Sequence, residues 1–294
     1  LKVSFARPHS PYDPPPVYYE MYRDHPIPPP YVGDWAHIHD GREGAADVNA
    51  WRSRRPEHET RRARACYYGS VTFIDHQIGR LLYELRHYHR DAWQNTFVLF
   101  TSDHGDMLGD HHLWRKTYAY EGSARIPMIL RPPDGWKWPR GLVLDHLVEL
   151  RDVMPTFLEA AGAPIPENVD GKSLLPLARG ETETPWRDVL LGEHDWCYSH
   201  EQANYYLTDG RWKFVWFPYL GTEQLFDLQQ DPGECRNLSG DPKSRDVAGA
   251  LRRRMVRELE ARDCGLVEEG KLVRLRLDQV VRSPHLQRYA CREE

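Results

Sequence analysis

A short apolar run that ends directly in ionisable residues is the feature of this sequence that most restricts its fold. Residues 96–101 (TFVLFT) are rich in strand formers, a pattern typical of a central strand covered on both faces. Ser102, Asp103, His104 and Gly105 follow without a break. Because open α/β sheets place ligands at the carboxyl ends of their strands, we expect a functional site here.

The segments around this run predict further helices and buried strands. Residues 1–5 (LKVSF) and 126–130 (IPMIL) have the pattern of buried strands, and residues 147–161 that of a helix stopped by Gly162. An amphipathic helix should follow Tyr67, because apolar residues recur there at helical spacing. Those residues are Val71, Ile74, Ile78, Leu81, Leu82 and Leu85.

The remaining segments predict a proline-rich loop and a second, smaller subdomain. Residues 8–30 hold two runs of three prolines and should form a long surface loop, because proline fits neither a helix interior nor a central strand. Residues 205–207 and 212–217, joined by Asp209-Gly210, predict an antiparallel hairpin, and residues 246–262 a charged amphipathic helix. We therefore expect a catalytic α/β domain over residues 1–185 and an α+β subdomain over residues 186–294.

Charge, hydropathy and cysteine content exclude several classes of function. The net charge of −5 gives no electrostatic footprint for nucleic acid, and no stretch approaches the roughly 18 to 20 apolar residues that span a bilayer. The five cysteines form no close pair for zinc or redox chemistry, and their odd number disfavours a disulfide scaffold. We expect a soluble protein whose compartment and oligomeric state stay open. The cysteines are Cys66, Cys197, Cys235, Cys264 and Cys291.

Asp103 and His104 have two readings. A carboxylate beside an imidazole can ligate a divalent cation, but the same residues can also form a strand-ending turn with a capping Asp. The neighbouring residues favour a site, because so many ionisable groups beside a buried strand are typical of tuned active sites. These neighbours are Asp106, Asp110, His111, His112, Arg115 and Lys116.

Residues 101–131 (TSDHGDMLGDHHLWRKTYAYEGSARIPMILR) resemble the metal- and anion-binding segment of the sulfatase family, in the alkaline phosphatase superfamily. Residues 3–12 (VSFARPHSPY), 225–238 (LFDLQQDPGECRNL) and 170–176 (DGKSLLP) agree with the same family in order and spacing. The resemblance covers roughly the C-terminal two thirds of a typical member. It implies a mostly parallel α/β sheet sandwiched by helices, followed by a smaller subdomain that contains an antiparallel sheet.

The resemblance also implies roles for four residues. Asp103 and His104 match two metal ligands of the family, Lys116 the lysine that contacts a sulfate oxygen, and His9 the histidine near the leaving group. Negative charge gathers on the sulfate oxygens during S–O cleavage, so a metal ion and a lysine suit that transition state, and an acid suits the departing alkoxide. The resemblance favours one Ca²⁺ ion, with Mn²⁺ second.

The sequence also departs from the family pattern. It contains neither the early pair of metal-binding aspartates nor the C-x-P-S-R or S-x-P-S-R segment whose Cys or Ser becomes the formylglycine nucleophile. We expect these upstream, in a longer protein that hydrolyses a carbohydrate, aryl or alkyl sulfate, and no turnover by this chain alone. The alternatives are a phosphonate monoester or phosphodiester hydrolase and a non-catalytic fragment.

Several aromatic residues remain open between packing and substrate contact. Trp136 and Trp138 could stack on a sugar ring or pack beside a proline-rich loop. Four residues of the second subdomain could select a sulfated small molecule or glycan. They are Tyr198, His200, Tyr205 and Tyr206.

Overall fold

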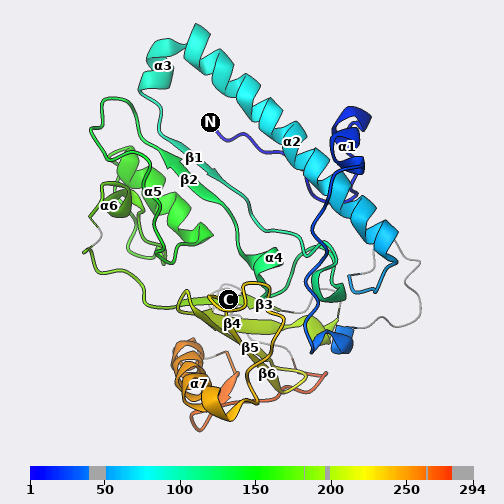
Figure 1. Cartoon of the computed structure of the whole chain (residues 1–294). Coiled ribbons are helices and arrows are strands. Elements are labelled where there is room, and N and C mark those ends of the chain that lie inside the picture. The colour runs from blue at the N-terminus through cyan, green and yellow to red at the C-terminus, as the bar shows by residue number, and fades with distance from the viewer. Residues whose placement is uncertain (40–50, 182, 196–198, 263, 280–294) are drawn as a thin grey trace, which may run out of the picture. The chain divides into compact units, whose positions relative to one another are not determined.

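The computed structural model describes residues 1–39, 51–181, 183–195, 199–262 and 264–279, and the chain divides into two compact units (Figure 1). The first unit comprises Leu1–Pro30, His39–Arg115 and Arg125–Trp186, and the second comprises Tyr31–Ile38, Lys116–Ala124 and Arg187–Glu294. The expected division into a catalytic domain over residues 1–185 and a subdomain over residues 186–294 stays a prediction. Residues 31–38 and 116–124 were expected in the catalytic domain, but they belong to the second unit because they form hydrogen bonds with residues 213–235. The Asp34 N–H, for example, donates to the Cys235 carbonyl at 2.9 Å.

Helix α1 (Pro16–Arg23) packs against helix α2 (Glu57–Tyr88) in the first unit. Gly69 permits this approach, because a Cβ atom there would lie 2.8 Å from the Tyr18 carbonyl oxygen. The prediction of a continuous loop over residues 8–30 is therefore wrong at α1. Pro15 and Pro16 stand at the N-cap and the first helical position, where the missing N–H costs no hydrogen bond.

The amphipathic helix expected after Tyr67 is confirmed as the C-terminal part of α2. The helix begins earlier than its apolar pattern suggested, because its first turns bury polar side chains such as Thr60 and Arg64. A short helix, α3 (Arg90–Gln94), follows it and leads into the first strand.

Strands β1 (Val98–Thr101) and β2 (Met128–Arg131) confirm the two expected strands of this unit, with Thr101 opposite Met128. They form a two-stranded antiparallel sheet, and both are half-buried instead of covered on two faces. All strand pairs in the described residues are antiparallel, so the parallel part of the expected sheet has no counterpart among them.

The strand expected at residues 1–5 is wrong. These residues are exposed and extended without strand pairing, since no strand of the described residues accepts their backbone hydrogen bonds. An apolar run alone does not make a strand.

The helix expected over residues 147–161 is shorter and has two parts. A 3₁₀ turn, η3 (Leu150–Asp152), precedes α5 (Val153–Ala160), and the chain leaves the helix at Gly162, whose φ is +68°. Asp152 is fully buried and fixes where this helical segment begins, because its carboxylate accepts the N–H groups of Glu149 at 2.9 Å and Lys172 at 2.8 Å. Helix α6 (Leu175–Ala178) follows the loop of residues 161–174.

The second unit is built on a four-stranded antiparallel sheet in the order β3-β4-β5-β6. Its strands are β3 (Leu190–His194), β4 (Asn204–Thr208), β5 (Trp212–Phe217) and β6 (Thr222–Asp227). Helix α7 (Arg245–Glu260) packs on β4 and β5, and Phe214, Leu225 and Met255 are fully buried in the shared core. The predicted hairpin and C-terminal helix are both confirmed. A two-residue pair, β7 (Val267–Glu268) and β8 (Lys271–Leu272), also contacts α7.

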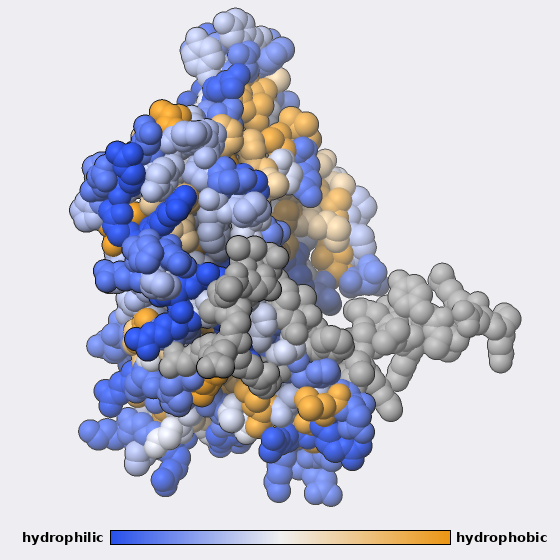
Figure 2. Space-filling model, turned by 90° about the vertical axis from the view of Figure 1, so that its right-hand side faces the viewer, coloured by the Kyte–Doolittle hydropathy of each residue, from blue (hydrophilic) through white to orange (hydrophobic). Residues whose placement is uncertain are grey.

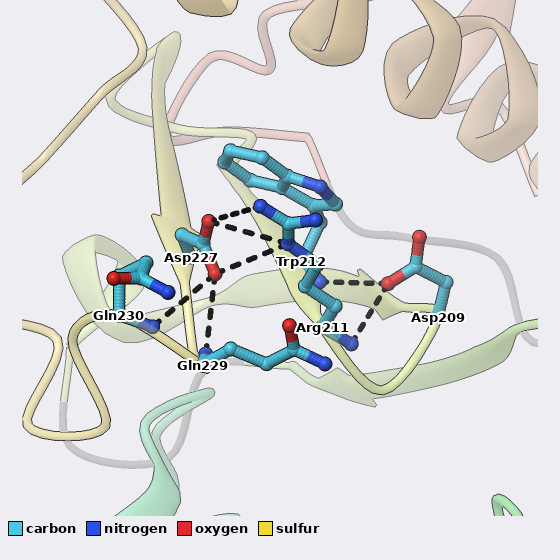
Figure 3. Close-up of polar contacts among 6 residues, drawn as sticks. All are labelled: Asp209, Arg211, Trp212, Asp227, Gln229 and Gln230. Carbon is cyan, nitrogen blue, oxygen red and sulfur yellow. Dashed lines mark hydrogen bonds and ion pairs between the residues drawn. The ribbon is translucent and has the colours of Figure 1, made fainter.

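The hairpin between β4 and β5 shows why Asp-Gly signals a tight turn (Figure 3). The Asp209 carboxylate accepts the N–H groups of Arg211 at 2.9 Å and Trp212 at 2.7 Å, and Gly210 has a φ of +92°. Arg211 then reaches across to β6, where its guanidinium lies 2.9 Å from the Asp227 carboxylate. The turn and the neighbouring strand are thus fixed by the same few polar groups.

The surface agrees with the hydrophilic composition of the chain. On the face drawn in Figure 2, hydrophilic residues predominate and hydrophobic residues form separate patches. Among the helices of the described residues, none combines the length and the apolar character needed to cross a bilayer.

Candidate active site

Asp103 and His104 stand just beyond the end of β1 with their functional atoms on the same side. The Asp103 Oδ2 and His104 Nε2 atoms are 3.8 Å apart. The other carboxylate oxygen, Oδ1, accepts the His104 backbone N–H at 3.1 Å, which fixes the carboxylate beside the ring. The Asp103 side chain is 85% exposed, so it holds a charge without a burial penalty.

The orientation of the His104 ring suits a metal ligand. Its Nδ1 lies 2.7 Å from the Gly105 carbonyl oxygen, so Nδ1 carries the hydrogen and donates a hydrogen bond to that oxygen. The lone pair is then left on Nε2, the atom that faces Asp103. A hydrogen bond that fixes the tautomer in this way is common for histidines that bind metals.

The donor atoms of this pair fit one divalent cation in part. An exposed carboxylate oxygen and an imidazole nitrogen on the same side can share an ion such as Ca²⁺ or Mn²⁺. The described residues contain no group of three or more His, Cys, Asp or Glu side chains that could hold a metal. Asp103 and His104 thus offer two of the ligand atoms that a cation site would need.

His9 lies beside the pair in the first unit. The ring centroids of His9 and His104 are 5.8 Å apart, with an angle of 67° between the rings. The His9 Nδ1 atom donates to the Ser10 carbonyl oxygen at 2.6 Å, and this leaves Nε2 as the atom for proton transfer. The structure thus brings together three of the four residues predicted for the site, although 94 positions separate Asp103 from His9.

Lys116 is the fourth predicted residue, and it belongs to the second unit. It is partly buried and begins the segment Lys116–Ala124, which includes helix α4 (Glu121–Ala124). Its contact with a sulfate oxygen beside Asp103 stays a prediction.

Asp106 and Tyr12 join the same site, although sequence reasoning assigned neither of them a role of its own. The Tyr12 hydroxyl donates to both carboxylate oxygens of Asp106, at 3.0 and 2.9 Å. Burial raises the pKa of Asp106 above its usual value, against its hydrogen bonds from Leu108 and Tyr12. Burial and the Asp106 charge also raise the pKa of Tyr12, and mainly burial raises that of the neighbouring Tyr67 to about 12.

The loop that follows Asp106 is an unusual stretch of backbone. Four of its residues other than glycine have positive φ: Leu108, His111, His112 and Arg115, at 49°, 53°, 63° and 68°. Each such residue costs of order 1 kcal/mol, and strain of this kind persists only where surrounding contacts hold it. Arg64 of α2 supplies two of these contacts, donating to the Leu108 carbonyl oxygen and to Asp110, both at 3.1 Å.

Most of the other candidate residues have structural contacts. Tyr205 is buried in the core of the second unit, which excludes it from substrate selection. His200 packs edge-on against Tyr219, and the Trp136 and Trp138 rings lie 4.5 Å apart, beside Phe97 and Arg179. Cys66 is partly buried and Cys264 is buried, whereas Cys197, Tyr198 and Cys291 lie outside the described residues.

Several polar side chains of residues 225–238, among them those of Asp227, Glu234 and Asn237, are bonded within the second unit. Lys213 on β5 is buried and lies 2.8 Å from Glu234 and 2.6 Å from Glu121. Burial lowers the pKa of Lys213, but the two carboxylates outweigh it and hold the pKa above its usual value. Asn237 accepts the Leu225 N–H at 3.1 Å. This motif stabilises its own unit.

Comparison with known protein families agrees with the fold and with these motifs. The family model described as "Sulfatase" matches residues 1–163, more than half of the chain, and the model "N-sulphoglucosamine sulphohydrolase, C-terminal" matches residues 109–261. The helices and strands define an α/β protein of the alkaline phosphatase superfamily. The chain belongs to the sulfatase family.

Similar individual proteins include hydrolases of two kinds of ester. An arylsulfatase of Clostridium perfringens is 44% identical over 93% of this chain and 56% of its own length, and a choline-sulfatase of Rhizobium meliloti is 34% identical over 83% and 46%. A phosphonate monoester hydrolase from Silicibacter pomeroyi has a similar structure, with a TM-score of 0.74 and 28% identity over 91% of this chain and 58% of its own. The chain spans about half the length of the curated relatives it matches.

Proposed function

We propose that the protein to which this chain belongs hydrolyses sulfate esters. The observation that carries the proposal is the cluster of His9, Asp103 and His104 in a chain of the sulfatase family. Two of these residues offer ligand atoms on one side, and the third offers an imidazole nitrogen for proton transfer. A sulfate ester needs both, because its nonbridging and leaving oxygens gather negative charge as the S–O bond breaks.

His9 would protonate the departing oxygen as general acid. An imidazole has an ordinary pKa near neutrality, so it can hold a proton before the reaction and release it during S–O cleavage. The hydrogen bond from Nδ1 to the Ser10 carbonyl orients the ring so that Nε2 performs this transfer. The exposure of His9 leaves room for the ester group of a substrate.

Asp103 and His104 would hold the cation, and Lys116 would bind a nonbridging sulfate oxygen. We favour Ca²⁺ because most of its ligands in a family site are oxygens, and Mn²⁺ second because His104 adds an imidazole. When bound, the cation supplies positive charge against the sulfate oxygens. The nucleophile would be a formylglycine, derived from Cys or Ser, in a segment of the protein outside this chain.

The substrate would be a sulfated small molecule or glycan. The similarity to an arylsulfatase and a choline-sulfatase favours sulfate esters, whereas the similarity to a phosphonate monoester hydrolase supports the alternative of a phosphorus ester. Both substrates present a tetrahedral monoanion to the same ligand pair, so the fold does not separate them.

Turnover of matched substrates by the full-length protein tests the proposal. We expect higher kcat/KM for nitrophenyl sulfate than for the nitrophenyl ester of phenylphosphonic acid, which has the same leaving group. A preference for the phosphonate would establish the alternative. Loss of turnover of both esters on chelation, with recovery on adding Ca²⁺ and less on adding Mn²⁺, would support the proposed metal. Sulfatase turnover that survives complete metal removal would contradict the role given to Asp103 and His104.

A further inference from the structure

We propose that Asp106 and Tyr12 are positioning residues that hold the His9 loop in place against the Asp103–His104 pair. The inference rests on the proposed function, because it assigns to two more residues the geometry on which general-acid catalysis by His9 depends. It concerns only the first unit, where all the contacts involved are found.

Asp106 links both ends of the loop that follows the ligand pair. Its Oδ1 atom accepts the N–H groups of Leu108 and Arg115, each at 3.0 Å. The Met107 N–H also donates to the Arg115 carbonyl at 2.7 Å, so the base of the loop is closed by side chain and backbone together. The Asp106 carboxylate thereby fixes the backbone of the loop that begins two residues after His104.

The same carboxylate also reaches the segment that carries His9. Tyr12 lies three residues after His9, and its hydroxyl donates to Asp106. The Tyr12 ring packs edge-on against Tyr67 of α2, with centroids 6.2 Å apart, so the hydroxyl has little freedom to turn away. Asp106 is therefore bonded both to the loop after the ligand pair and to the segment that carries the proposed acid.

The strained backbone gives a physical reason for this hydrogen-bonded centre. The loop places Leu108, His111, His112 and Arg115 at positive φ, a conformation that would relax if its contacts were lost. The N–H groups of Leu108 and Arg115 both donate hydrogen bonds to the Asp106 carboxylate. A displacement of about 1 Å between an acid and its leaving group can cost as much as 100-fold in rate, so a fixed His9 loop has catalytic value.

Tyr12→Phe tests the link, because it keeps the ring and removes only the hydroxyl. The matched control is Tyr22→Phe, which removes a hydroxyl bonded to Thr72 at 2.6 Å between α1 and α2, where neither residue belongs to the proposed site. In the full-length protein, we expect Tyr12→Phe to lower kcat by about 10- to 100-fold on an alkyl sulfate and much less on nitrophenyl sulfate. Tyr22→Phe should lower neither.

A double-mutant cycle with His9→Ala separates positioning from a general structural role. If Tyr12 acts through His9, Tyr12→Phe should have almost no further effect on the alkyl sulfate in the His9→Ala background. Equal losses on both substrates, an undiminished loss in that background, or behaviour like that of Tyr22→Phe would each overturn the inference.

Hydrogen exchange measures the link without activity. Tyr12→Phe should speed amide exchange in residues 5–13, and Asp106→Ala should also speed it in residues 106–116, whereas Tyr22→Phe should change neither segment. If the wild-type protein turns over no sulfate ester, the proposed function fails. The exchange measurement then tests the Tyr12–Asp106 link independently of activity. Faster exchange in Tyr12→Phe supports the link, and unchanged exchange in residues 5–13 overturns it.

Discussion

The polar residues beside β1 in the first unit and those of the 225–238 motif in the second differ in their surroundings. In the second unit, the polar residues of the 225–238 motif bond to one another and to β5, as the buried Lys213–Glu234 pair does at 2.8 Å. In the first unit, Asp103 is 85% exposed and His9 is also exposed, beside a loop with strained backbone. Both motifs resemble the same family, but Asp103 and His9 stand at the surface, whereas Lys213 and Glu234 are buried.

This difference separates two reasons for which a family motif can exist. A buried, fully bonded polar group is needed for folding, because removing its partner leaves an unpaired charge in the interior. An exposed carboxylate beside an oriented imidazole adds little to stability, so we expect its role to lie in binding or catalysis. Substitutions at the exposed residues Asp103, His104 and His9 should therefore reduce activity with little loss of stability, and substitutions at buried, bonded residues such as Lys213 should reduce stability.

The largest effect is expected at the ligand pair. Asp103→Asn and His104→Ala should each lower kcat/KM for nitrophenyl sulfate by about four powers of ten in the full-length protein, because the cation would lose a ligand. The thermal midpoint should stay within a degree or two of the wild type, and Asp75→Asn on the exposed face of α2 serves as control. A drop in midpoint that parallels the loss of activity would remove the contrast between the units.

His9→Ala and Lys116→Ala should each lower kcat/KM by about two to four powers of ten, the range for loss of a general acid or a preorganised charge. Their substrate dependence should differ. His9→Ala should harm alkyl or sugar sulfates more than nitrophenyl sulfate, whose phenolate leaves without much help, and Lys116→Ala should harm both alike. Equal losses for His9→Ala, measured with both substrates, would exclude the general-acid role.

In the second unit, Lys213→Ala should cost about 3 to 5 kcal/mol of stability, because it leaves the buried Glu234 carboxylate without its cation, near the partly exposed Glu121. Hydrogen exchange of residues 204–227 should show the loss, and Lys243→Ala, which removes an exposed lysine, is the control. Unchanged exchange in Lys213→Ala would mean that the buried triad does not stabilise this sheet.

The smallest effect is expected at Asp227, beside the half-exposed Arg211. Arg211 holds the pKa of Asp227 below its usual value, so the pair stabilises the fold above the unfolded pKa of about 4, and this stabilisation is lost as the pH falls through the lower folded value. Asp227→Asn should cost about 1 kcal/mol at pH 7, since solvent screens the exposed Arg211, and less at pH 3. Denaturant midpoints at the two pH values measure this. A difference that grows on acidification would contradict the sign.

Much of the fold could be predicted from local patterns. The α2 periodicity, the runs that became β1 and β2, and the Asp-Gly hairpin are confirmed, because each depends on spacing or turn chemistry within a few residues. The strand expected at residues 1–5 failed because a strand requires a partner that the run itself does not specify. Helix α1 was missed because prolines stop a helix in its interior but suit its first turn.

The sequence by itself determined the family and most of the local elements, because these depend on residue identity and order along the chain. The tertiary structure decided that Tyr12 bonds to Asp106, that His9 lies beside His104, and that Lys213 is buried between two carboxylates. These contacts join residues far apart in the chain, and their strength depends on distance, orientation and burial. A linear pattern contains none of these three quantities, and only the folded backbone sets them.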